Sequence, residues 1–302
     1  MFSGLFVALR FGLNDDFKYE QGLVKMFLKE TESYGDPVHF SQALAMKAEM
    51  FGRHGNFDLA VDVTNEMRGK YIVEEHSHLI SHTYGSDRSG QCIAQSALWY
   101  LQLGQVESAL QVCSYVVEEL LPKMDPQNVG NSFLILYPVI WVMKDHGRAN
   151  EARAAFEKHV LQTFAKRLDE RGLTSDRPLH HPIKYLLDLH SSDGATEFLR
   201  DYLDWAIVDK HGLFGAELNY TMGSAGRTAD TITAELCLLL AKHRSTNQYE
   251  RAHLICKGFE VAREALNLTA EKNESRGMIV AYSQIKPIYD ELEALHNDLP
   301  IG

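Results

Sequence analysis

A short outline recurs along this chain, and it constrains the possible folds more than any other feature of the sequence. It is clearest in three ten-residue stretches: HGNFDLAVDV from His54, LGQVESALQV from Leu103 and HGRANEARAA from His146. Each stretch has a glycine, a small or apolar residue two steps later and an alanine five steps after the glycine. Aligned on that glycine, further members are centred on Gly194 and Asn247, at spacings of 49, 43, 47 and 53 residues. A repeat of this period predicts an array of similar structural units.

Apolar residues surround each centre at steps of three and four, which is the pattern of amphipathic helices. A glycine or asparagine between two such helices supplies the turn, because either residue tolerates a positive φ where the first helix must stop. Each unit is therefore predicted to be a hairpin of two antiparallel helices. Small residues, Ala48 with Ala60 and Ala97 with Ala109, are expected where the paired helices approach most closely.

The array over residues 38–266 resembles the tetratricopeptide repeat family. The resemblance rests on the small residue before the turn, the glycine, the aromatic or apolar residue after it and the alanine three residues further on. The fourth unit departs from the pattern with Leu199 in place of alanine. The period is longer than the roughly 34 residues of that family, so longer tetratricopeptide-like arrays attached to signalling ATPases are a better comparison. The resemblance implies an all-α, right-handed superhelical array of about five antiparallel helix hairpins, an α-solenoid.

Three regions are expected: N-terminal capping helices over residues 1–37, the array over 38–266, and a C-terminal capping helix with a tail over 267–302. Residues 271–296 predict the last amphipathic helix, which would cover the apolar face of the final unit. Two long connections, residues 69–90 and 208–230, carry most of the extra length of the units. Asp87 or Ser89 is expected to cap the helix that follows the first connection.

Composition narrows the class of protein. With 45% hydrophobic and 24% charged residues, the chain has the profile of a soluble protein with a packed core. A net charge of −11 argues against a nucleic-acid partner and suits a basic protein or peptide partner. The apolar opening MFSGLFVALRFGL is interrupted by Arg10 and is too short to span a bilayer, so no membrane association is expected. Four cysteines without CxxC spacing indicate a reduced, cytoplasmic protein, and no cofactor is expected.

In the family that the array resembles, the first helix of each hairpin lines a concave groove. By that analogy, amides, long cations and aromatic rings between the core positions of the first helices would hold an extended peptide, with Trp141 or Tyr185 packing its anchors. The residues expected to contact the partner are Gln42, Glu49, Arg53, Gln91, Gln95, Leu98, Tyr137, Trp141, Lys184, Tyr185, Asp188 and Arg244.

The segment EEHSHLISH from Glu74 is the most enzyme-like stretch. If it is helical, Glu75, His78 and His82 lie on one face and present ligands that suit Zn²⁺, although HExxH is absent. The alternative interpretation is a solvated, histidine-rich helix end, and we do not assign a metal site. Glycine turns before two predicted helices, near Arg88 and Arg227, invite a phosphate site but lack the residue order of a P-loop.

The sequence therefore predicts a non-enzymatic scaffold that binds a peptide or protein segment in its concave groove. Two alternatives remain open at this point. One is the sensor or regulatory part of a larger signalling protein, and the other is a metal-dependent enzyme that uses the Glu74–His82 segment.

Overall fold

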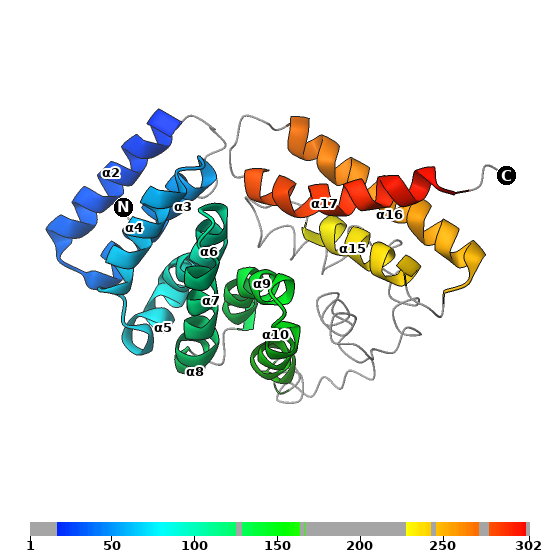
Figure 1. Ribbon diagram of the computed structural model, residues 1–302. Helices are drawn as coiled ribbons and strands as arrows, with labels where there is room; N and C mark the ends of the chain where they lie inside the picture. Colours follow the sequence, from blue (N-terminus) through cyan, green and yellow to red (C-terminus); the bar gives the residue numbers. More distant parts are fainter. Residues whose placement is uncertain are drawn as a thin grey trace. The chain divides into compact units, whose positions relative to one another are not determined.

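The computed structural model describes residues 17–124, 129–163, 166, 228–242, 246–271 and 278–299. Every regular element within these ranges is helical (Figure 1), which confirms the all-α prediction. None of the described helices is both long and apolar enough to cross a membrane. Contacts divide the chain into two compact units, Met1–Ser175 and Asp176–Gly302, and each is described by itself.

The first unit contains three helix hairpins, which we number in chain order. In each hairpin a first helix (α3, α6 or α9) is followed by a second helix (α4, α7 or α10) after a three-residue turn. The elements of this unit are α2 (Phe17–Tyr34), α3 (Pro37–Arg53), α4 (Phe57–Arg68), α5 (Val73–Tyr84), α6 (Arg88–Gln102), α7 (Val106–Tyr115), η1 (Val116–Leu120), α8 (Leu121–Lys123), α9 (Val129–Asp145), α10 (Ala149–Phe156) and η2 (Glu157–Leu161).

The three turns have the same backbone. The middle residue of each turn is a glycine in the left-handed region, with φ of 73° at Gly55, 73° at Gly104 and 76° at Gly147. The amide that follows each glycine donates to the carbonyl five residues earlier, as in a Schellman motif. These bonds join Asn56 to Phe51 at 2.9 Å, Gln105 to Tyr100 at 2.8 Å and Arg148 to Met143 at 2.8 Å. The predicted positive-φ turn is confirmed in the first three units.

The repeated alanines lie in the first turn of each second helix. The amides of Ala60, Ala109 and Ala152 donate to the carbonyl of the residue that precedes the helix, at 3.0, 3.0 and 3.1 Å. All three side chains are fully buried, as are Ala48 and Ala97 on the first helices. Because a methyl group adds little bulk, the two helices of a hairpin can pack closely at these positions.

Each hairpin packs against the next one along the chain. Helix α6 contacts α3 and α4 of the first hairpin and α9 of the third, and α7 also contacts α9. Glycines permit the approach between first helices. A Cβ on Gly52 would lie 2.6 Å from the ring of Trp99, and one on Gly90 would lie 2.9 Å from Cδ1 of Ile135.

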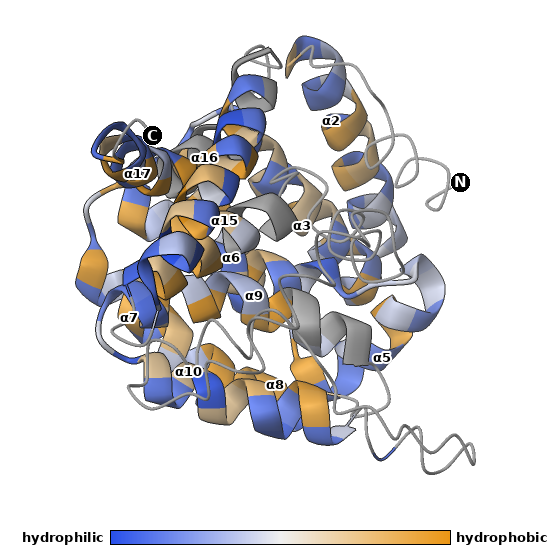
Figure 2. Ribbon diagram, turned by 90° about the vertical axis from the view of Figure 1, so that its right-hand side faces the viewer, coloured by the Kyte–Doolittle hydropathy of each residue, from blue (hydrophilic) through white to orange (hydrophobic). Residues whose placement is uncertain are grey.

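Helix α2 precedes the first hairpin and packs on α3. Hydrophilic and hydrophobic residues alternate along it (Figure 2), and it buries Val24 and Phe27. Between the first two hairpins, the long connection contains the additional helix α5, which contacts α3 and α6. This helix accounts for part of the extra length of the repeat.

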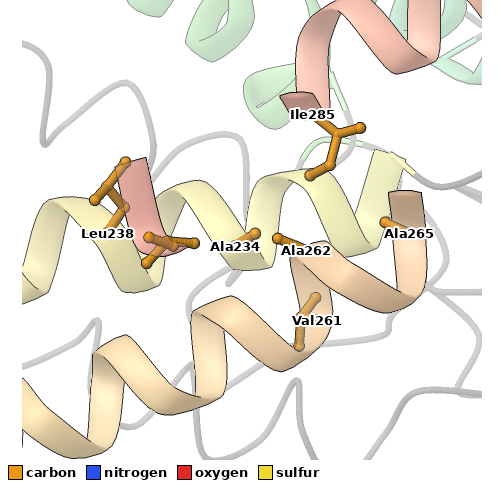
Figure 3. Close-up of a cluster of buried hydrophobic side chains, with 7 residues drawn as sticks. Ala234, Leu238, Val261, Ala262, Ala265 and Ile285 are labelled. Atoms are coloured by element: carbon orange, nitrogen blue, oxygen red, sulfur yellow. The ribbon is translucent and has the colours of Figure 1, made fainter. Parts of the chain in front are cut away.

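The second unit contains α15 (Thr228–Lys242), α16 (Gln248–Glu271) and α17 (Met278–Asn297). Figure 3 shows the apolar cluster formed where these helices meet, with Ala234 and Leu238 on α15, Val261, Ala262 and Ala265 on α16, and Ile285 on α17. Leu292 on α17 is fully buried in the same cluster. The predicted last amphipathic helix therefore exists and covers the preceding pair.

The predicted register of the fifth unit is wrong in its second helix. The repeat places a small or apolar residue two steps after each centre, which in the fifth unit is Tyr249. This side chain is 90% exposed, whereas Leu254 and Ile255 are buried. The reason lies in the turn. Asn247 is the residue that caps α16, with its Oδ1 accepting from the amide of Glu250 at 2.9 Å, so it corresponds to the residue after the glycine in the other hairpins. The fourth unit, centred on Gly194, lies outside the described residues.

We predict that Gly104→Ala destabilises the protein by roughly 1–2 kcal/mol, because an L-residue resists the left-handed conformation. Gly22→Ala is the matched control. Gly22 lies within α2 with open space around its Cα, so the same substitution is expected to stabilise by up to about 1 kcal/mol through helix propensity. The free energy of unfolding from urea titrations measures both changes. Equal effects of the two substitutions would contradict the turn geometry.

Candidate functional site

The residues expected to contact a partner differ in how deeply they are buried on the first helices. Gln42 on α3 and Gln91 on α6 are buried, whereas Glu49, Arg53, Gln95 and Leu98 are partly exposed. Lys184, Tyr185, Asp188 and Arg244 lie outside the described residues. Only the partly exposed group lies where a ligand can reach it without rearrangement of the helices.

Two polar contacts, a hydrogen bond and an ion pair, join side chains of α3 and α6. The Nε2 of Gln42 donates to Oγ of Ser89 at 2.8 Å, and an ion pair joins Nη1 of Arg88 to Oε1 of Glu49 at 3.6 Å. The side chains of Glu49 and Arg88 keep 12% and 18% of their surface exposed. These contacts join two of the residues proposed to contact a partner, Gln42 and Glu49, to Ser89 and Arg88, which were not predicted as partner contacts.

Three polar atoms of this group are shielded from solvent and have no hydrogen-bond partner: Oε1 of Gln42, Oε1 of Glu49 and Nε of Arg88. Buried polar atoms are nearly always hydrogen-bonded in native proteins, and each one left without a partner costs about 1–3 kcal/mol. Oε1 of Gln42 and Nε of Arg88 therefore each lack a hydrogen bond, and Oε1 of Glu49 has only the longer ion pair with Nη1 of Arg88.

Tyr137 and Trp141 correct the expectation of aromatic rings in an open groove. They are 2% and 3% exposed, because α9 contacts α6, α7, α10 and both η segments and so has neighbours on several sides. The two rings contact each other edge to face at 5.9 Å, and Nζ of Lys144 lies 4.5 Å from the centre of the Trp141 ring. The indole Nε1 of Trp141 has no hydrogen-bond partner. Pro138 lies inside α9.

Arg53 also differs from its expected role. Its guanidinium pairs with the buried carboxylate of Glu20 on α2, whose other oxygen lies 3.1 Å from Nε2 of His54. The ring of Phe17 packs edge-on against His54 at 4.8 Å. Arg53 therefore joins α2 to the end of α3, a contact that depends on a helix outside the repeat.

The side chains considered for a metal, Glu75, His78 and His82, are all exposed on α5. The rings of His78 and His82 are 6.5 Å apart between centres. In the part of the chain that the structure describes, no group of three or more His, Cys, Asp or Glu side chains is arranged to hold a metal ion. The buried histidine of this helix is His76, whose Nδ1 accepts from the amide of Ile72 at 3.1 Å.

Asp87 positions the start of α6 and is fully buried. Its Oδ1 accepts from the amide of Gly90 at 3.0 Å, which confirms the predicted cap, and its Oδ2 accepts from Oη of Tyr71 at 2.5 Å. Burial raises the pKa of the Asp87 carboxyl, and the hydrogen bonds from Gly90, Tyr71 and Ser77 oppose that rise. Burial and the adjacent carboxylate likewise raise the pKa of Tyr71. The network fixes the helix that carries Arg88, Gln91 and Gln95.

Comparison with known proteins gave no match: no protein-family model, no curated protein and no solved structure is similar to this chain at a significant level. The resemblance to the tetratricopeptide repeat family therefore rests on the repeat alone.

The raised pKa of Asp87 predicts how stability changes with pH. A carboxyl that holds its proton more tightly in the folded state contributes stability below its unfolded pKa, about 3.9, and loses that contribution as pH rises through its folded pKa. We expect the melting temperature of the wild type to fall relative to that of Asp87→Asn between pH 4 and pH 7. Asparagine is the matched replacement because it also caps helices well. If the melting temperature of the wild type instead rises relative to that of the variant over this range, the pKa of Asp87 in the folded protein is lowered and not raised.

Proposed function

We propose that this protein is a non-enzymatic, tetratricopeptide-like helical scaffold that binds a peptide or protein segment along its first helices. Three features of the first unit support the solenoid arrangement. The hairpins share one turn geometry, each hairpin packs on the next, and α6 lies between α3 and α9 in the order of contacts. Repeats that contact their neighbours in chain order build extended binding surfaces in solenoid proteins.

The observation that carries the proposal is the incompletely bonded polar group on the first helices. Glu49 on α3 and Arg88 on α6 belong to the part of this group that a ligand can reach, and each holds a polar atom without a hydrogen bond, Oε1 of Glu49 and Nε of Arg88. A peptide backbone offers amide donors and carbonyl acceptors in alternation, so it supplies both kinds of partner. Glu49 and Arg88 are the partly exposed members and would meet the peptide first.

A positively charged segment suits this chain best, because its net charge is −11 and electrostatic attraction raises the rate of association. We place the protein in the cytoplasm on the state of its thiols. All four cysteines are free, and burial raises the pKa of Cys113 and Cys237 to about 12, so these thiols remain protonated and unreactive.

A random peptide library displayed on phage tests the proposal. Peptides selected on the wild type should bind the double variant Glu49→Gln with Gln95→Ala at least about tenfold more weakly, which corresponds to about 1.4 kcal/mol. The matched control is Glu66→Gln with Gln111→Ala. It makes the same chemical changes at exposed positions of the second helices α4 and α7.

Binding should be unchanged in the control. If no peptide is selected, or if the selected peptides bind both double variants equally, the first helices are not the binding surface.

A further inference from the structure

The first unit contains a pocket of about 280 Å³. Its lining residues belong to other segments of the chain than the polar group of α3 and α6. Its apolar wall consists of Leu121, Pro122 and Met124, at and just after α8. Its polar wall consists of Ser132 on α9 with Lys158, His159 and Thr163 at the end of the third hairpin. Ligand pockets span roughly 300–1,000 Å³, so this pocket lies just below that range and has room only for a small ligand.

Burial varies across the lining residues in the manner of a pocket with a closed base and an open rim. Leu121, Met124 and Ser132 are buried, His159 and Thr163 are partly exposed, and Pro122 and Lys158 are exposed. An apolar group that enters this pocket can contact the buried side chains of Leu121 and Met124, while a polar group can stay near the exposed Lys158.

Two π-helical segments border the pocket. The amide of Leu121 donates to the carbonyl of Val116 at the end of η1, and that of Gln162 donates to Glu157 at the end of η2, both across five residues. π-helical turns are rare and occur frequently at functional sites, since the additional residue per turn displaces the side chains that follow. Leu121 on one wall directly follows η1, and Lys158 and His159 on the other wall lie within η2.

The charges around the pocket favour an anion. Lys158 carries a positive charge, and none of the seven lining residues in the part of the chain that the structure describes is acidic. The carboxylates of Glu119 on η1 and Glu157 on η2 are engaged elsewhere, with Lys123 at 3.3 Å and Arg153 at 3.2 Å. Burial and the charge of Lys158 lower the pKa of His159, so at neutral pH its ring is uncharged and offers one hydrogen-bond donor and one acceptor.

We propose that this pocket binds a small amphipathic monocarboxylate. Its apolar chain packs on Leu121, Pro122 and Met124, and its carboxylate pairs with Lys158 and accepts hydrogen bonds from the polar wall. The proposal does not depend on peptide binding, because it uses other helices and another kind of ligand.

Isothermal titration of the full chain with octanoate tests the proposal. We expect saturable binding at one site, weakened about tenfold in Lys158→Gln through loss of the ion pair. Lys25→Gln is the matched control, because Lys25 is an exposed lysine on α2, and it should bind octanoate as the wild type does. Octylamine, which has the same chain and the opposite charge, should bind far more weakly.

Thr163→Phe tests the location, because the larger ring fills the pocket and should abolish the binding of octanoate. Circular dichroism and the melting temperature show whether each variant is folded. If Thr163→Phe does not fold, Lys158→Gln decides the test, because it changes an exposed side chain. The proposal would be overturned if octanoate shows no saturable binding to the wild type up to about 10 mM. Equal binding by octylamine, or a Lys158→Gln variant that binds as tightly as Lys25→Gln, would overturn it as well.

Discussion

The first unit depends on one backbone constraint, a left-handed glycine between two helices, which is repeated three times. At Gly55, Gly104 and Gly147 the chain reverses with a positive φ, and the next amide returns a hydrogen bond to the end of the first helix. A side chain at the glycine would oppose this conformation. Because the turn has three residues each time, the second helix begins at the same distance from the glycine and places its alanine, fully buried, in its first turn. The similar hairpins then pack on one another in order.

This packing places the first helices where their polar side chains meet. Glu49 and Arg88 form an ion pair between successive hairpins, and Gln42 bonds to Ser89 beside it. The buried network of Asp87 and Tyr71 holds the start of α6, and therefore Arg88, in place. The turn sets where each second helix begins, and the hairpins therefore pack in a fixed register. That register places the polar side chains of the first helices side by side, where the peptide surface is proposed. The pocket has a different origin, since its lining includes Leu121 just after η1 and two residues of η2, where the second helices depart from α-helical geometry.

Much of the first unit could be predicted because its signals are local. Glycine marks the turn, small residues mark the close contacts, and Asp87 is a helix cap three residues before the amide it binds. The errors arise where tertiary packing decides. Tyr137 and Trp141 fit the spacing of a groove, but α9 has neighbours on several sides and buries them. Arg53 binds Glu20 of a helix outside the repeat, and Asn247 is a cap where a turn residue was expected. The pocket gave no signal in the sequence, since π-helical segments have no simple spacing pattern.

Amide hydrogen exchange by NMR at Asn56, Gln105 and Arg148 tests the repeated turn most directly. In each hairpin this amide donates across the glycine to the carbonyl of the first helix, so it is protected only while the turn is closed. The three amides should exchange much more slowly than the same residues in an unstructured peptide, with similar protection at all three positions. Exchange at the unstructured rate at any of them would mean that the hairpin there is not closed by this turn, and the shared register of the helices would be lost.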